Sequence, residues 1–243
     1  MTSAHPLIFF HIMKCAGTSV RGGLTRGVVG QRHGPGIFEL DGQAAIRAAG
    51  GTDGDNWRFR DALLPYVCAT LGPQVVLGHF RYRDRYAEVL GDAHLVTVLR
   101  DPLERFVSLY RYRRYKSDAH ETIAMPFDEF VSSRRWSREG HAYVDTFCGR
   151  DGLDPGSDEA ATAAVDNLRK FAVVGRSDHL DDFAQRVTAV AGREVTIPRV
   201  NASPAPSGAP PEETGIDDRS LEQARLVCAP DYRVYERFFG DQS

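Results

Sequence analysis

Residues 7–19 run Leu-Ile-Phe-Phe-His-Ile-Met-Lys-Cys-Ala-Gly-Thr-Ser, and this stretch decides the fold class. Its first half is a continuous apolar run, which is typical of a strand buried on both faces of a parallel sheet. The run then breaks into Lys14, two small residues and Gly17, a pattern that predicts a tight turn. Thr18 or Ser19 lies near the start of the helix expected next. The unpaired N–H groups at such a helix start, with Lys14 beside them, predict a site for phosphate or sulfate.

A second apolar run, residues 94–99, ends in the segment 100–110, which is Arg-Asp-Pro-Leu-Glu-Arg-Phe-Val-Ser-Leu-Tyr. Asp101 is a suitable helix N-cap, Pro102 suits the first helical position, and Glu104 occupies the acidic position of a capping box. The sequence therefore predicts a strand followed at once by a helix.

The helix predicted after Arg100 has two different faces. Its apolar side chains recur at helical spacing on one face, at Leu103, Phe106, Val107 and Tyr110. Arg105, Ser108 and Tyr112 lie on the opposite face, which we expect to meet solvent or a ligand cleft. Arg100 itself comes at the carboxyl end of its strand, where open α/β sheets bind their ligands.

Together these two segments resemble the sulfotransferases that use 3′-phosphoadenosine 5′-phosphosulfate, and more closely their carbohydrate-type, heparan 2-O-sulfotransferase-like branch. That family opens with a strand and a Pro-Lys-Thr-(Gly/Ala)-Gly-Thr-Ser-like loop, which grips the 5′-phosphosulfate. Four positions match this loop, namely Lys14, Gly17, Thr18 and Ser19, whereas Met13 and Cys15 depart from its commonest residues. The second family signature, Arg-Asp-Pro-x-x-Arg-x-x-Ser-x-Tyr, binds the 3′-phosphate and matches residues 100–110 throughout.

The resemblance continues along the rest of the chain. Residues 77–80, Leu-Gly-His-Phe, are similar to the family's Gly-His segment after a strand. Residues 173–175 and 180–183 look like a later strand and helix of the family, and residues 231–238 look like its closing helix. The resemblance implies a P-loop-like sulfotransferase fold formed by one domain over residues 1–243.

The family's donor site can be carried over to the matching positions of this chain. The resemblance implies that the backbone N–H groups of residues 16–19, with both hydroxyl groups, hold the 5′-phosphosulfate, and that Arg100 and Ser108 bind the 3′-phosphate. Asn201-Ala202-Ser203 resembles the segment that closes over the nucleotide, although a solvent loop without a role is an equal alternative. The donor-binding residues so predicted are Lys14, Cys15, Ala16, Gly17, Thr18, Ser19, Arg100, Ser108, Asn201 and Ser203.

Sulfuryl transfer from this donor needs a base, a cation and rigid positioning, and it requires no metal. His79 is the candidate general base, because an imidazole accepts a proton near neutral pH. Lys14 would neutralise charge on the transferring sulfuryl group and on the leaving oxygen. If His79 is not the base, Glu39 or Asp41 would be the alternatives. The acceptor would be a hydroxyl group of a sugar or a small metabolite.

Composition agrees with one three-layer α/β domain, in which helices flank a mostly parallel sheet. The chain has 243 residues, of which 42% are hydrophobic and 26% charged. A net charge of −3 argues against general nucleic-acid binding. No apolar run is long enough to span a membrane and no secretory leader is recognisable, so we expect a cytoplasmic protein. The four widely separated cysteines predict neither a disulfide framework nor a metal site.

Local patterns predict the remaining elements. Helices are expected at about 56–71, 127–134 and 158–170, and short strands at 75–77 and 171–174. The Gly-rich segment at about 27–56 predicts loops and short helices near the acceptor, and the Pro-rich segment at about 199–215 predicts a flexible loop. Basic residues cluster within 81–85 and within 100–116, which predicts a positive cleft for a polyanionic donor and, as a weaker inference, an anionic acceptor.

Two other functions remain open at this point. A nucleotide-dependent kinase would use a similar sheet, but the chain has no Gly-x4-Gly-Lys-Ser/Thr loop and no evident magnesium-binding pair. A non-catalytic nucleotide-binding module would keep the fold and lose the chemistry. The presence of Lys14, His79, Arg100 and Ser108 together argues against such degeneration.

Overall fold

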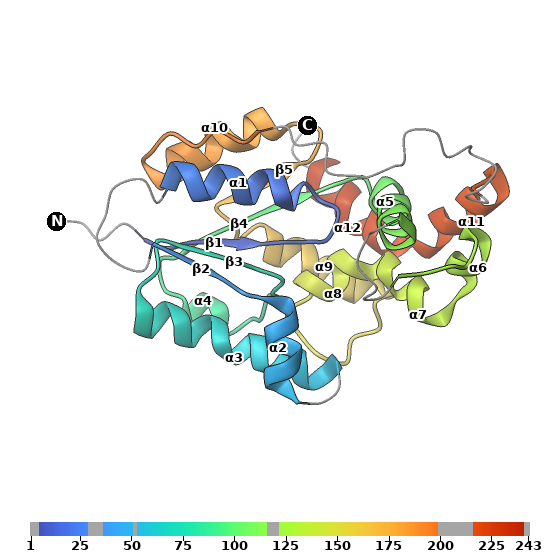
Figure 1. The fold of residues 1–243 in the computed structure, drawn as a ribbon, viewed down its shortest axis with the longest axis horizontal. Helices are drawn as coiled ribbons and strands as arrows, with labels where there is room; N and C mark the ends of the chain where they lie inside the picture. Colours follow the sequence, from blue (N-terminus) through green and yellow to red (C-terminus); the bar gives the residue numbers. More distant parts are fainter. Residues whose placement is uncertain (1–4, 29–35, 51–52, 116–121, 199–215, 241–243) are drawn as a thin grey trace.

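The computed structural model describes residues 5–28, 36–50, 53–115, 122–198 and 216–240. Its centre is a sheet of five parallel strands in the order β2-β3-β1-β4-β5 (Figure 1). The strands are β1 (Leu7–Phe10), β2 (Ile37–Glu39), β3 (Val75–Gly78), β4 (His94–Leu99) and β5 (Val173–Arg176). Phe10 is in register with Gly78 of β3 and with Thr97 of β4. The residues that follow these strands therefore meet at one edge of the sheet.

Helices cover both faces of the sheet. Leu7 and Phe9 of β1 pack on one face against α1 (Gly17–Val28) and α10 (Leu180–Ala191). The alternate residues, Ile8 and Phe10, pack on the other face. The helices on that second face are α2 (Gly42–Ala49), α3 (Asp53–Leu71), α4 (Tyr86–Val89), α8 (Ala142–Phe147), α9 (Asp158–Leu168) and α12 (Ala229–Gly240). The prediction of a three-layer α/β fold with a parallel sheet is confirmed, because strands buried on both faces need helices on both sides.

A separate helical cluster lies beyond the end of the sheet toward which the strands run (Figure 1). It contains α5 (Pro102–Tyr115), α6 (Phe127–Ser132), α7 (Arg134–Ser137), the 3-10 helix η1 (Arg138–His141) and α11 (Asp218–Val227). Aromatic rings form most of its core; Phe130, for example, lies 5.1 Å from Phe106 and 5.5 Å from Trp136 between ring centroids. This cluster supplies a wall opposite the carboxyl edge of the sheet.

Several predicted boundaries need correction. The segment at about 27–56 contains the edge strand β2 besides α2 and the start of α3, whereas only loops and short helices were expected. A run of three residues is too short for a pattern to indicate a strand, and β2 depends on pairing with β3. The helix predicted at 127–134 is two helices, because Ser133 is extended between α6 and α7.

The other predicted elements occur with small shifts. The helix expected at 56–71 begins three residues earlier, that at 158–170 ends at Leu168, and the last strand spans Val173–Arg176. The Pro-rich segment 199–215 lies outside the described residues. Within the described parts of the chain, no helix has the length and apolar character needed to cross a membrane.

Candidate functional site

The turn between β1 and α1 is the first part of the site. Lys14 and Ala16 both adopt left-handed backbone conformations, with φ of 69° and 57°. Such conformations cost about 1 kcal/mol or more in a non-glycine residue and persist only where the surroundings impose them. The Ala16 carbonyl accepts a hydrogen bond from the Val20 N–H at 3.0 Å, so α1 starts directly after the turn, at Gly17. The predicted strand, tight turn and helix are therefore confirmed.

Gly17 is required by a close approach. A Cβ atom at this position would lie 1.7 Å from Nε2 of His11, so the imidazole of His11 packs directly on the glycine. Only a residue without a side chain leaves room for that ring. Of the two hydroxyl residues after it, Thr18 is exposed and Ser19 is buried.

Tyr143 connects this turn to the end of β4. Its hydroxyl oxygen lies 3.6 Å from Sγ of the buried Cys15 and accepts a hydrogen bond from the Arg100 N–H at 2.9 Å. The same hydroxyl donates to the Arg100 carbonyl. The two predicted donor-binding segments therefore meet at one buried tyrosine, which no motif indicated. Burial raises the pKa of Cys15 to about 11, which agrees with a packing residue and not with a reactive thiolate.

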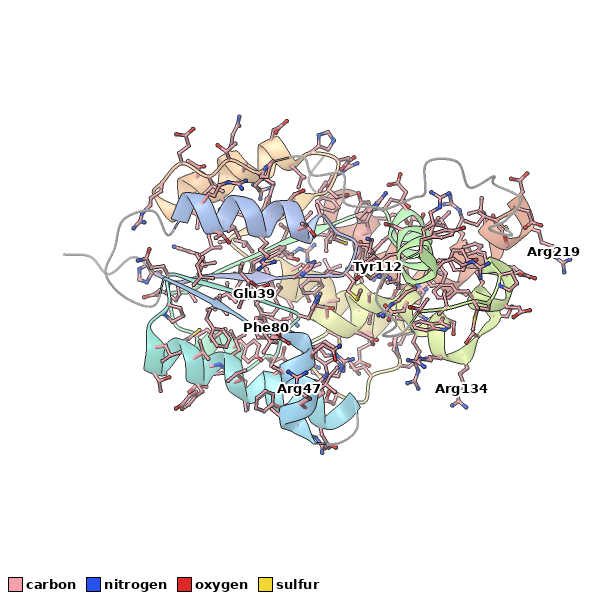
Figure 2. All side chains as sticks on the ribbon, viewed as in Figure 1. Glu39, Arg47, Phe80, Tyr112, Arg134 and Arg219 are labelled. Atoms are coloured by element: carbon pink, nitrogen blue, oxygen red, sulfur yellow. The ribbon has the colours of Figure 1, made fainter. Side chains whose placement is uncertain are left out.

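Lys14 and Arg100 come close enough to influence each other. Burial lowers the pKa of Lys14, and the positive charge of Arg100 lowers it further. Nζ of Lys14 lies 4.5 Å from the centre of the Tyr112 ring, which projects from α5 toward the turn after β1 (Figure 2). Nε of Arg100 lies 3.1 Å from a carboxylate oxygen of Glu104, and about a third of the arginine side chain is exposed. Lys14 in the turn before α1, with the charge of Arg100 acting on it, is suited to bind a phosphate or sulfate.

The helix after Arg100 begins as predicted, but two of the three residues on its predicted polar face are buried. The carboxylate of Asp101 accepts a hydrogen bond from the Glu104 N–H at 3.0 Å, which confirms the N-cap. Ser108 is buried, and Arg105 is completely buried with its guanidinium 3.8 Å from Asp231 of α12. Arg105 therefore does not meet solvent, but Arg105 and Tyr112 both line the open cavity described below, which agrees with the cleft alternative. Helical spacing shows which residues share a face, but only the position of α12 decides what covers it.

His79 is held in a defined orientation at the carboxyl end of β3. Its Nδ1 lies 2.6 Å from the carbonyl oxygen of His11, and Nη1 of Arg60 donates to the backbone carbonyl of His79 at 3.1 Å. A carbonyl oxygen only accepts, so the neutral imidazole carries its proton on Nδ1 and leaves Nε2 as an acceptor. Burial lowers the pKa of His79; the bond to His11 raises it and Arg60 lowers it.

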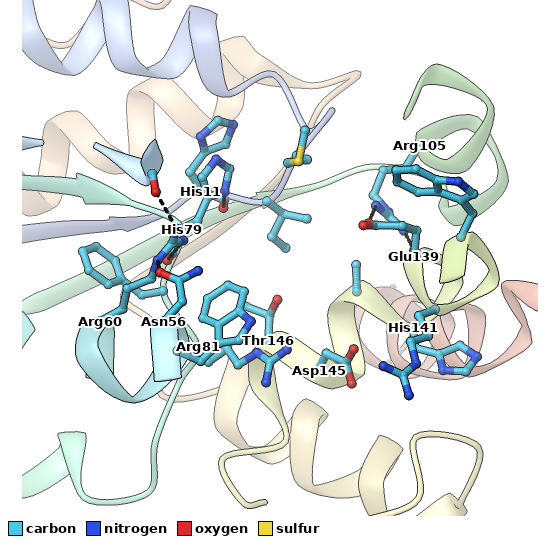
Figure 3. Close-up of a pocket in the computed structure, with 18 of the residues that line it drawn as sticks. His11, Asn56, Arg60, His79, Arg81, Arg105, Glu139, His141, Asp145 and Thr146 are labelled. Carbon is cyan, nitrogen blue, oxygen red and sulfur yellow. Dashed lines mark hydrogen bonds and ion pairs between the residues drawn. The ribbon is translucent and has the colours of Figure 1, made fainter. Parts of the chain in front are cut away.

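An open cavity of about 1610 Å³ lies between the sheet edge and the helical cluster (Figure 3). His11, Met13 and His79 line it on the sheet side, and Arg105, Glu139 and His141 on the opposite side. Lys14, Arg100 and Ser108 are not among its lining residues. The structure therefore places the predicted base in a cavity that adjoins, but does not contain, the predicted cation pair.

The cavity wall is rich in arginine and aromatic side chains. Besides Arg105, its cationic residues are Arg60, Arg81, Arg113, Arg134, Arg135 and Arg138, whereas the acidic lining residues within the described part of the chain are Glu139 and Asp145. The Arg81 guanidinium lies 4.2 Å from the centre of the Trp57 ring and has no carboxylate within ion-pair distance in the described part of the chain. Arg83 from the same predicted basic cluster instead pairs with Asp61 at 2.6 Å. The cavity therefore carries a net positive lining.

The two alternative bases have structural contacts of their own. The carboxylate of Glu39 lies 2.8 Å from Nη2 of Arg21. Asp41 is the N-cap of α2 and accepts a hydrogen bond from the Ala44 N–H at 2.7 Å. Neither residue lines the cavity, whereas His79 does. Asn201 and Ser203 lie outside the described residues, and the described residues contain no cluster of three or more His, Cys, Asp or Glu that could hold a metal ion.

Comparisons with known proteins add no assignment. No protein-family model matches this sequence, and a search of curated proteins returns no significant relative.

Proposed function

We propose that this protein is a sulfotransferase that moves a sulfuryl group from 3′-phosphoadenosine 5′-phosphosulfate to a hydroxyl group of a sugar or a small metabolite. The observation that carries the proposal is the meeting of three features at one sheet edge. These are Lys14 in the turn before α1, Arg100 directly after β4, and an imidazole, His79, with Nε2 available as an acceptor. The two cations suit a donor with two anionic ends, and the imidazole suits an acceptor hydroxyl group that must lose its proton.

The residues near the turn fit the donor. Helix α1 presents backbone N–H groups at its start, where the helix dipole also favours an anion. Lys14 can approach a sulfuryl group bound there, because its backbone already holds it in the turn. Arg100 follows β4, which neighbours β1 in the sheet, so it can bind a second phosphate of the same nucleotide.

The chain's own groups would act as follows. Nε2 of His79 takes the proton of the acceptor hydroxyl as its oxygen attacks sulfur, and the bond between sulfur and the phosphate oxygen breaks in line. The ammonium group of Lys14 stabilises the negative charge that develops on that leaving oxygen. The lowered pKa of His79 keeps its imidazole neutral and ready to accept a proton at neutral pH.

The lining of the cavity supports an anionic acceptor. Arg81 and Arg138 contribute positive charge, and neither has an ion-pair partner in the described part of the chain. Trp57 and Trp136 supply aromatic faces on opposite walls. A sugar or metabolite that carries carboxylate, sulfate or phosphate groups would be attracted electrostatically and packed against these rings.

Calorimetric titration with 3′-phosphoadenosine 5′-phosphate, with AMP and ATP as controls, tests the donor site. Micromolar binding that requires the 3′-phosphate supports the proposal, and an acceptor screen with radiolabelled donor then follows. A preference for ATP favours the kinase, and 3′-phosphate-dependent binding without transfer to any acceptor favours the non-catalytic module. Absence of binding to all three nucleotides overturns the proposal.

A further inference from the structure

Three aromatic rings are stacked along the end of β1. The rings of Phe9 and His11 have centroids 5.6 Å apart and planes inclined by 16°, and the rings of His11 and His79 have centroids 4.3 Å apart and planes inclined by 25°. The edge of the His11 ring also packs on Gly17, as described above. The imidazole of His11 is therefore held on several sides, and it in turn covers one face of the imidazole of His79.

His11 contacts His79 through two different groups. Its backbone carbonyl accepts the hydrogen bond from Nδ1 of His79 at 2.6 Å, and its ring stacks on the His79 ring. The carbonyl selects the tautomer of His79, whereas the stacked ring restricts rotation of the imidazole about χ2. With Nδ1 bound and one face covered, Nε2 is the ring nitrogen that remains as an acceptor, and the residue lines the cavity (Figure 3).

The charges around the pair agree with two neutral rings. Burial lowers the pKa of His11 to about 3, and the positive charges of His79, Lys14 and Arg21 contribute to this shift. Arg60 from α3 faces His79 and disfavours its protonated form. A neutral His11 stacks on His79 without electrostatic repulsion and lets His79 gain a proton transiently.

We propose that His11 is the positioning residue of the general base, holding His79 in one tautomer and one ring orientation so that Nε2 accepts the acceptor proton. The catalytic meaning of this inference rests on the proposed function, but the two-point contact between the histidines does not. No sequence motif indicates His11 in this role. Phe10 pairs with Gly78, so His11 and His79 are the residues that directly follow this pair.

Two variants separate the ring from the carbonyl. His11→Phe keeps an aromatic ring against His79 and the same backbone carbonyl, whereas His11→Ala keeps only the carbonyl. We expect His11→Ala to lower kcat by about tenfold to hundredfold, as misplacement of a reacting group does. Affinity for 3′-phosphoadenosine 5′-phosphate should change by less than about threefold. A fall in affinity parallel to the fall in kcat would instead indicate that the loop structure is lost. His11→Phe should stay within about threefold of the wild type in kcat.

The decisive measurement is the tautomer and pKa of the His79 imidazole, obtained by nitrogen NMR during a pH titration. In the wild type and in His11→Phe we expect one neutral tautomer, with the proton on Nδ1, and a pKa below the ordinary value of about 6.5. In His11→Ala the His79 ring is more hydrated, so the pKa of His79 should rise toward the ordinary value. The acidic limb of the pH–rate profile should then move by the same amount. Circular dichroism melts check that each variant is folded.

A double variant adds a further test. If His11 acts only through His79, adding His11→Ala to His79→Ala should lower kcat no further than His79→Ala alone. Unchanged titration of His79 in His11→Ala, or fully additive losses in the double variant, would overturn the inference. A shifted His79 titration in a protein that binds no nucleotide would instead refute the proposed function and leave the histidine pair established.

Discussion

The hydroxyl of Tyr143 accepts a hydrogen bond from the backbone N–H of Arg100 at 2.9 Å. This contact joins α8, on one face of the sheet, to the residue that directly follows β4. The same hydroxyl lies 3.6 Å from Sγ of Cys15, in the turn after β1. The spacing between the two segments proposed to bind the donor is therefore set from within the core.

Replacing Tyr143 by Phe tests this connection. The substitution keeps the buried ring and removes the hydroxyl, so the Arg100 N–H and carbonyl lose their partner. We expect the free energy of unfolding to fall by about 1–3 kcal/mol, the cost of unsatisfied buried polar groups. Affinity for 3′-phosphoadenosine 5′-phosphate should fall more than affinity for AMP, because Arg100 is proposed to bind the 3′-phosphate. Urea unfolding and calorimetry measure the two effects, and an equal loss for both nucleotides would contradict the second.

The left-handed backbone of Ala16 predicts an unusual response to glycine. At φ of 57° a side chain is unfavourable, so Ala16→Gly relieves strain while it adds entropy to the unfolded chain. We expect the two effects to cancel within about 0.5 kcal/mol or to favour the variant. The matched control is Ala189→Gly in α10, at an exposed helical position, which should cost about 1 kcal/mol. Equal losses in both variants would show that Ala16 is not strained.

The stability of the protein should depend on pH through His11. Its pKa is about 3 in the folded protein and about 6.5 when unfolded, so the unfolded chain binds more protons between these values. Stability from this group is present above pH 6.5 and is lost as the pH falls, by about 2 kcal/mol between pH 6.5 and 5. The wild type should therefore lose about that much more than His11→Phe over this range in urea unfolding. Comparing the two proteins cancels the contributions of groups that do not interact with His11, and parallel pH curves would exclude the effect.

The buried pair of Arg105 and Asp231 should be strongly coupled. Both side chains have no exposed surface, and their closest charged atoms lie 3.8 Å apart. Asp231→Ala leaves the guanidinium without the closer of its two carboxylate partners, since Glu139 lies 4.0 Å away, and we expect a loss of about 3–5 kcal/mol. Combining it with Arg105→Met removes the buried charge as well, so the double variant should lose less than the sum of the single variants. A strictly additive double variant in chemical unfolding would argue that the two charges do not interact.

Lys14 and Arg100 should differ in what they contribute. Lys14 is proposed to stabilise the leaving oxygen, so Lys14→Ala should lower kcat by about a hundredfold or more while donor affinity changes less. Arg100→Ala should raise the donor dissociation constant by about tenfold or more, because it removes a charge-assisted contact to phosphate. Glu104→Gln is a control, since it removes the carboxylate next to Arg100 and should not weaken donor binding. Steady-state rates with calorimetric affinities separate the roles, and a loss confined to affinity in Lys14→Ala would count against its catalytic one.

The predictable parts of this protein are those encoded by neighbouring residues. The apolar run of β1, the turn at Lys14 and the N-cap at Asp101 follow from short-range patterns, and the structure contains all three. The strand β2 was missed because three residues carry no periodic signal of their own. No local pattern indicates His11, because its contact with His79 joins residues that are 68 positions apart in the chain.

The sequence by itself determined the parallel α/β fold and which residues follow each central strand, because burial on two faces and helix capping leave local signals. Only the tertiary structure decided what those residues meet. Packing of α12 covers Arg105 with Asp231, packing of α8 places Tyr143 between Cys15 and Arg100, and the register of β1 with β3 stacks His11 on His79. These contacts join residues distant in the chain, and their free energy depends on burial and geometry that no local pattern contains.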